Sequence, residues 1–73
     1  MPRLPVLSGR DVVRGLERLG FDRIGQRGSH VKLRRGSVTV IVPDHREVRR
    51  GTLAVIVHQA GISIDDLMTA LSH

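Results

Sequence analysis

The stretch Arg27-Gly28-Ser29-His30-Val31-Lys32-Leu33-Arg34-Arg35 alternates apolar and polar residues after a glycine-containing turn. Side chains along a strand point to opposite faces in turn. Val31 and Leu33 therefore share one face, while the histidine and the cations that alternate with them share the other. We predict a strand at His30–Arg34 that closes a core with one face and presents His30 beside positive charge with the other.

A helix is predicted before this strand, between Ser8 and Gly20. Ser8 is placed to cap its N-terminus with Asp11 as the capping-box partner. Its apolar stripe recurs at helical spacing and consists of Val12, Val13, Leu16 and Leu19. Gly20 is expected to end the helix in the left-handed conformation. Residues 1–7, which include two prolines, are expected to be an extended lead-in.

Two further strands are predicted, at residues 21–26 and 37–43. The second has the stronger signal, because every residue from Val38 to Val42 is β-branched. Gly36 permits the tight connection before it. If the alternate valines face the core, Ile41 lies on the open face of the sheet, where an exposed isoleucine suggests contact with a partner.

The C-terminal part of the chain predicts two helices after a polar, basic loop at residues 44–50. The first helix has an apolar stripe from Leu53 to Ala60 and ends at Gly61. A second capping box, Ser63 with Asp66, starts a short helix that ends near Leu71.

The order of helix, three strands, helix and short helix predicts an α+β fold. We expect a two-layer sandwich, with a three-stranded antiparallel sheet covered by helices on one face. This order matches that of double-stranded-RNA-binding domains. A chain of 73 residues has room for one core, so residues 1–73 are expected to form one domain.

Positive charge is concentrated in one part of the chain. Twelve Lys and Arg residues face seven Asp and Glu residues, a formal charge of +5, and all twelve cations precede Gly51. This pattern is typical of a protein with a polyanionic partner. A solvated arginine-rich surface is the alternative interpretation. With one Phe and neither Tyr nor Trp, base stacking on aromatic side chains is disfavoured, and we expect binding through phosphate charge and backbone shape.

The composition also bears on where the protein acts. There is no cysteine, which fits a reducing compartment. No apolar run approaches the roughly 18–20 residues of a membrane span, and no signal-peptide pattern opens the chain. We therefore expect a cytoplasmic protein without membrane association.

Four segments carry a family resemblance. They are Gly28-Ser29-His30, Val42-Pro43-Asp44-His45, Gly51-Thr52-Leu53 and Gln59-Ala60-Gly61-Ile62. In this order and spacing, from about Leu7 to Leu71, the chain resembles the HicA family of toxin–antitoxin mRNA interferases. The resemblance implies a double-stranded-RNA-binding-like fold, ribosome-independent cleavage of mRNA and neutralisation by a HicB-type antitoxin. It also implies that His30 is the catalytic histidine; for His45, a catalytic role and a bystander role both stay open.

The residue types around His30 suit RNA cleavage. Attack of a 2′-hydroxyl on the adjacent phosphorus needs a proton carrier, and imidazole titrates near neutral pH. Ser29 and His45 are candidates for catalytic support. Eight residues are predicted to bind RNA phosphates: Arg27, Gly28, Lys32, Arg34, Arg35, Arg46, Arg49 and Arg50.

A metal-dependent nuclease is the rival mechanism. It needs converging carboxylates, and only Asp44 and Glu47 flank His45, in a loop rich in arginine. We therefore predict an endoribonuclease that needs neither metal nor cofactor. A non-catalytic RNA-binding module is the second hypothesis, and a protein that uses its charge only to dock an acidic protein is the third.

Overall fold

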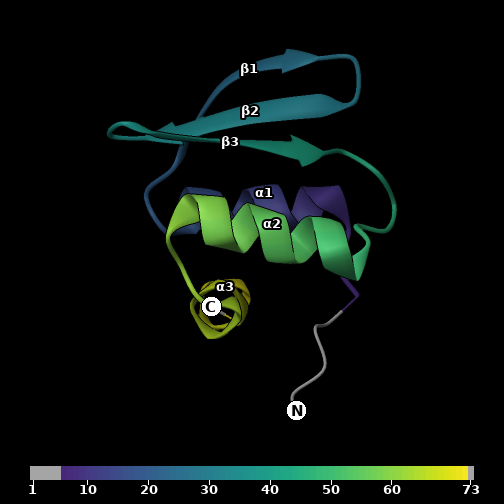
Figure 1. Cartoon of the computed structure of the whole chain (residues 1–73), viewed down its shortest axis with the longest axis vertical. Coiled ribbons are helices and arrows are strands. Elements are labelled where there is room, and N and C mark those ends of the chain that lie inside the picture. Colours follow the sequence, from purple (N-terminus) through teal and green to yellow (C-terminus); the bar gives the residue numbers. More distant parts are fainter. Residues whose placement is uncertain (1–5, 73) are drawn as a thin grey trace.

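A three-stranded antiparallel sheet and three helices make up the fold in the computed structural model, which describes residues 6–72. In chain order the elements are α1 (Gly9–Arg18), β1 (Asp22–Arg27), β2 (His30–Arg35), β3 (Val38–Pro43), α2 (Arg50–Ala60) and α3 (Ile64–Leu71). The strands are ordered β1-β2-β3, and α1 and α2 lie on one side of the sheet (Figure 1). The predicted α+β architecture is confirmed, including the order of its elements.

The helix ends follow the predicted local signals. The Ser8 hydroxyl accepts a hydrogen bond from the Asp11 amide at 3.0 Å, and the Ser63 hydroxyl accepts one from the Asp66 amide at 2.9 Å, so both capping boxes are present. Gly20 has a φ of 96°, the left-handed conformation expected after α1. The start of α2 carries no such signal, and its N-cap, Arg49, makes no capping hydrogen bond with its side chain.

The core lies between the sheet and the helices. Val31 and Leu33 of β2 and Val40 and Val42 of β3 are buried, as the strand alternation predicts. They pack in one cluster with buried residues of α1, α2 and the connections, among them Val12, Leu16, Phe21, Leu53 and Ile56. The lone aromatic residue is thus part of the core.

The loop before α2 is less polar than predicted. Val48 is buried, and its amide donates a 2.7 Å hydrogen bond to the Leu7 carbonyl in an isolated antiparallel bridge. The end of the lead-in is therefore fastened to this loop. The rest of the predicted lead-in, residues 1–5, lies outside the described residues.

Helix α3 lies on the side of α1 and α2 that is turned away from the sheet (Figure 1). It packs closely against α1, since a Cβ added at Gly15 would stand 2.5 Å from Leu67 Cδ1. Within residues 6–72, no helix is both long and apolar enough to cross a membrane.

Strand β1 projects beyond the helices. It is the strand farthest from the helices in Figure 1, and all six of its residues are exposed. Its pairing with β2 is irregular between Arg23 and Gly25. β1 is therefore open to solvent on both faces, whereas β2 buries Val31 and Leu33 on the face toward the helices.

Candidate functional site

His30 begins β2 on the sheet face turned away from the helices, which we call the open face. The register pairs it with Arg27 on β1 and with Pro43 on β3. Lys32, the next β2 residue on this face, is paired with Gly25 and Ile41. Two neighbouring rows of residues on the open face thus contain His30 and Lys32 at their centres.

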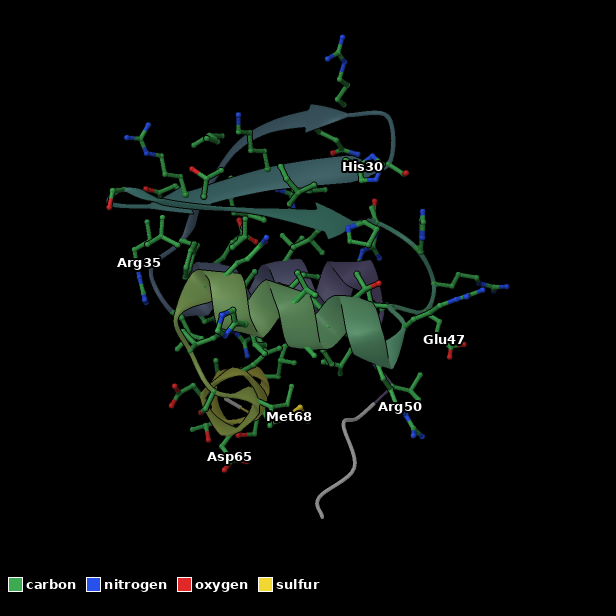
Figure 2. All side chains as sticks on the ribbon, in the orientation of Figure 1. His30, Arg35, Glu47, Arg50, Asp65 and Met68 are labelled. Carbon is green, nitrogen blue, oxygen red and sulfur yellow. The ribbon has the colours of Figure 1, made fainter. Side chains whose placement is uncertain are left out.

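Backbone contacts fix the turn that precedes His30. Gly28 has a φ of 58°, a conformation that favours glycine. The Gln26 side-chain amide donates a hydrogen bond to the Gly28 carbonyl at 3.1 Å. The Asp44 amide donates one to the Ser29 carbonyl at 2.5 Å, which ties the turn to the end of β3. The side chain of His30 is exposed, while these hydrogen bonds fix the backbone before it. Figure 2 shows His30 at the end of the sheet where β1 turns into β2.

A groove of about 560 Å³ runs from His30 toward the start of α2. We call it the histidine groove; it is lined by His30, Ile41, Pro43, His45, Glu47, Val48, Arg49 and Thr52. Both candidate catalytic histidines therefore border the same space, although they come from β2 and from the loop after β3. Arg49 supplies a cation there.

A second hollow, of about 360 Å³, lies over the open face. We call it the sheet groove; it is lined by Gly25, Gln26, Arg27, His30, Lys32 and Ile41. His30 and Ile41 line both grooves and so stand between them.

His45 is held by the start of α1. Its carbonyl accepts a 2.8 Å hydrogen bond from the Gly9 amide. The approach is so close that a Cβ at Gly9 would overlap the Pro43 carbonyl oxygen. The absence of a side chain at Gly9 therefore allows the loop that carries His45 to pack directly against the start of α1.

The predicted phosphate-binding cations fall into three groups. Arg27, Lys32 and Arg49 line the grooves that contain His30. Arg46 lines a separate hollow with Ser8 and Arg10, and Arg50 begins α2 without lining either groove. The structure thus brings three of the predicted cations to His30.

Arg34 and Arg35 lie at the far end of β2 from His30. Arg34 is on the open face, and its Nε donates a 2.8 Å hydrogen bond to the Gly36 carbonyl. Arg35 has the orientation of Val31 and Leu33: its guanidinium lies 4.6 Å from the centroid of the Phe21 ring and donates a 2.8 Å hydrogen bond to the Leu19 carbonyl. Figure 2 shows Arg35 and His30 at opposite ends of the sheet.

Thr52 and Glu47 border the histidine groove but were not predicted as RNA-binding residues. Thr52 belongs to the Gly51-Thr52-Leu53 segment of the family resemblance, so a signal for it existed. Glu47 carries no sequence signal for RNA binding. Residues 6–72 contain no cluster of three or more His, Cys, Asp or Glu side chains suited to a metal ion, and metal independence stays a prediction.

Comparison with known proteins identifies the family. A family model described as "HicA toxin of bacterial toxin-antitoxin" matches residues 9–62, from the start of α1 to just beyond α2. No curated protein matches the chain. The matched region contains both grooves and most of the chain, and we conclude that this protein belongs to the HicA family of toxins from bacterial toxin–antitoxin systems.

Proposed function

We propose that this toxin is an endoribonuclease that cleaves mRNA without a metal ion and without the ribosome. The observation that carries the proposal is that His30 and His45 line one groove together with Arg49. Strand cleavage needs one group to remove a proton, another to deliver one, and a cation for the phosphate. The histidine groove contains side chains suited to each of these roles.

The reaction follows from the nucleophile that RNA carries. His30 acts on the 2′-hydroxyl as general base, and the 2′-oxygen forms a bond to the adjacent phosphorus. The bond from phosphorus to the 5′-oxygen breaks, and a protonated His45 gives its proton to that oxygen. The products are a 2′,3′-cyclic phosphate and a 5′-hydroxyl end. The two histidines can exchange these roles without changing the overall balance of atoms and charge.

Charge stabilisation is assigned to the cations at the two grooves. The Arg49 guanidinium can hold two phosphate oxygens at once, whereas the Lys32 ammonium acts as a point charge. Arg27 stands beside His30 across the β1–β2 pair. Glu47 borders the same groove, and its carboxylate disfavours phosphate close to it. We therefore place the scissile phosphate at the His30 end.

The test is the cleavage rate of His30→Ala on purified message. The rate is expected to fall by a factor of about 10²–10⁴, which is what a positioned acid or base supplies. His30 is exposed, so its replacement leaves the core intact. His58→Ala is the matched control, because His58 is an exposed histidine on α2 that lines neither groove. Equal rates for His30→Ala and wild type would refute the assignment.

Two substrate experiments examine the chemistry. Replacement of the ribose at the cleaved bond by 2′-deoxyribose should block cleavage, because the nucleophile is then missing. Addition of EDTA should leave the rate unchanged. Cleavage of the deoxyribose substrate would indicate attack by water, and loss of activity with EDTA would indicate a required metal. RNA that is bound but never cut would support a non-catalytic binding module.

We propose that a HicB-type antitoxin silences the toxin by covering the histidine groove. A toxin of a toxin–antitoxin pair needs a partner that holds it inactive. Blocking substrate entry at His30 is the simplest way to do so. The test is hydrogen exchange of the toxin with and without the antitoxin. We expect increased protection in the β1–β2 turn and in the loop around His45; unchanged exchange there would show that inhibition works elsewhere.

A further inference from the structure

We propose that the sheet groove is a subsite for one unpaired nucleobase of the RNA strand, beside the bond that is cut. This assignment rests on the proposed function, since it places the bound base next to the scissile phosphate at His30. It makes single-stranded RNA the substrate and gives Gly25 and Ile41 a role in binding it.

The shape of the groove comes from one row of residues across the sheet. Gly25, Lys32 and Ile41 are neighbours on three successive strands. A Cβ added at Gly25 would meet no atom within 4 Å. The missing side chain therefore leaves the groove open at this position, with Lys32 and Ile41 bordering the space.

Ile41 provides an apolar surface in a polar setting. It lies on the open face with 42% of its surface exposed. Arg27 and Lys32 line the same space, and the hydrocarbon stems of such side chains can cover an apolar surface while their charges stay in water. A nucleobase is flat and largely apolar on its faces, so it can cover Ile41 while its own edges stay hydrated.

Charge selects a nucleotide as the occupant of this groove. The cations Arg27 and Lys32 border it, and none of the described residues that line it is acidic. An apolar ligand without phosphate would gain nothing from these cations. A guanidinium also stacks well on a base, which suits Arg27 at the edge of the groove.

The position of the groove links binding to cleavage. His30 and Ile41 line both the sheet groove and the histidine groove. A strand that crosses them can place a base on Ile41 and the adjoining phosphate at His30 together. The volume of about 360 Å³ lies within the range of small-ligand sites, about 300–1,000 Å³.

The groove fits an unpaired base better than a duplex. In an A-form helix the bases are stacked and paired, so their faces are unavailable. A single strand can turn one base out onto the sheet. Ile41 then does part of what an aromatic residue does in other single-strand binders, and the absence of Tyr and Trp is no obstacle.

Fluorescence anisotropy can test the subsite without any cleavage. The ligand is a short single-stranded RNA with 2′-deoxyribose at the cleaved bond, compared with the same strand lacking the base next to that bond. Gly25→Val fills the groove, and Ile41→Ser removes its apolar surface. Ile24→Ser is the matched control, since Ile24 is 50% exposed on β1 and does not line the groove. Circular dichroism verifies that each variant is folded.

Both groove variants should bind the intact strand roughly tenfold more weakly than wild type, the scale of one lost base contact. The control should bind as wild type does. Removal of the base should cost wild type a similar factor and cost Gly25→Val little, because that variant has already lost the contact.

The subsite is overturned if Gly25→Val and Ile41→Ser bind like the control, if base removal costs wild type and Gly25→Val equally, or if wild type binds no RNA. These results are separate from the His30 experiment. If His30→Ala leaves the cleavage rate unchanged, the catalytic assignment of His30 is refuted. If the cleavage rate depends on His30 but not on Gly25 or Ile41, only the subsite is refuted.

Discussion

Arg35, which was predicted to bind phosphate, makes contacts within the fold. Its guanidinium lies over the buried Phe21 ring and donates to the Leu19 carbonyl, on the helix side of the sheet. The two interactions connect β2 to the end of α1. The position of Arg35, one residue after Arg34, decides this outcome, because neighbouring residues of a strand face opposite ways.

Arg35→Ala should therefore lower the stability of the protein more than its affinity for RNA. We expect the free energy of unfolding to fall by about 1 kcal/mol, from the lost cation–π contact and hydrogen bond. RNA affinity should stay near that of wild type. Urea denaturation measures the first quantity and anisotropy titration the second.

Lys32→Ala is the matched variant for this comparison. Lys32 is exposed on the open face and lines the sheet groove. It should weaken RNA binding with little change in unfolding free energy. If Arg35→Ala weakens RNA binding as much as Lys32→Ala does, Arg35 contacts RNA, and its contacts within the fold do not account for its whole role.

The two glycines near the starts of α1 and α2 have opposite surroundings. A Cβ added at Gly9 would overlap the backbone of Pro43 and Asp44. A Cβ added at Gly51 would meet no atom within 4 Å. Both residues lie in the first turn of a helix. Only Gly9 is thus required by the packing of α1 against the loop that carries His45.

Gly9→Ala should destabilise the protein by about 1–3 kcal/mol, the usual cost of overpacking. Gly51→Ala should raise the free energy of unfolding by about 0.4–1 kcal/mol, because alanine restricts the unfolded chain without straining α2. Thermal or urea unfolding of the two variants measures this difference. Equal stabilities would show that α1 does not hold the loop as closely as the Gly9 contact indicates.

Helix α3 offers a test of whether stability and function are separate. It lies on the side of α1 and α2 away from the sheet, as Asp65 and Met68 show in Figure 2, and outside the region matched by the family model. Ser63→Ala removes its capping hydrogen bond and should cost about 1 kcal/mol in unfolding free energy. Cleavage at a temperature where the variant is folded should not change. A reduced rate under that condition would show that α3 acts on the grooves.

At the scale of the whole molecule, charge is unevenly distributed. The twelve cations precede Gly51, whereas α3 carries Asp65 and Asp66 and no Lys or Arg. A polyanion is therefore attracted more strongly to the open face, which carries Lys32 and Arg34, than to α3. We expect this uneven charge to orient the proposed RNA substrate before any specific contact is made.

RNA affinity should consequently fall steeply with salt. For a single strand, each phosphate neutralised contributes about 0.7 to the slope of log affinity against log salt concentration. Lys32→Ala should reduce that slope by about 0.7. Arg18→Ala is the control, since Arg18 donates a 2.8 Å hydrogen bond to the Ala70 carbonyl between α1 and α3. Equal slopes for the two variants would place the RNA away from the sheet groove.

Much of the fold was predictable because its signals act within a few residues. Ser8 and Ser63 cap helices through hydrogen bonds to residues three positions later, and the alternation in β2 decides which side chains are buried. The role expected for His30 came from short motifs in the right order. Periodicity, capping and motif order are all properties of the chain itself.

Only the tertiary structure shows the two grooves, and only it shows which predicted cations lie at these grooves and which make contacts within the fold. Strand register brings Gly25, Lys32 and Ile41 into one row, and the path of the loop after β3 brings His45 into the groove of His30. The burial of Val48 depends on a bridge to Leu7. Residues far apart in a chain become neighbours only when strands pair and helices pack, and no local pattern records which neighbours those will be.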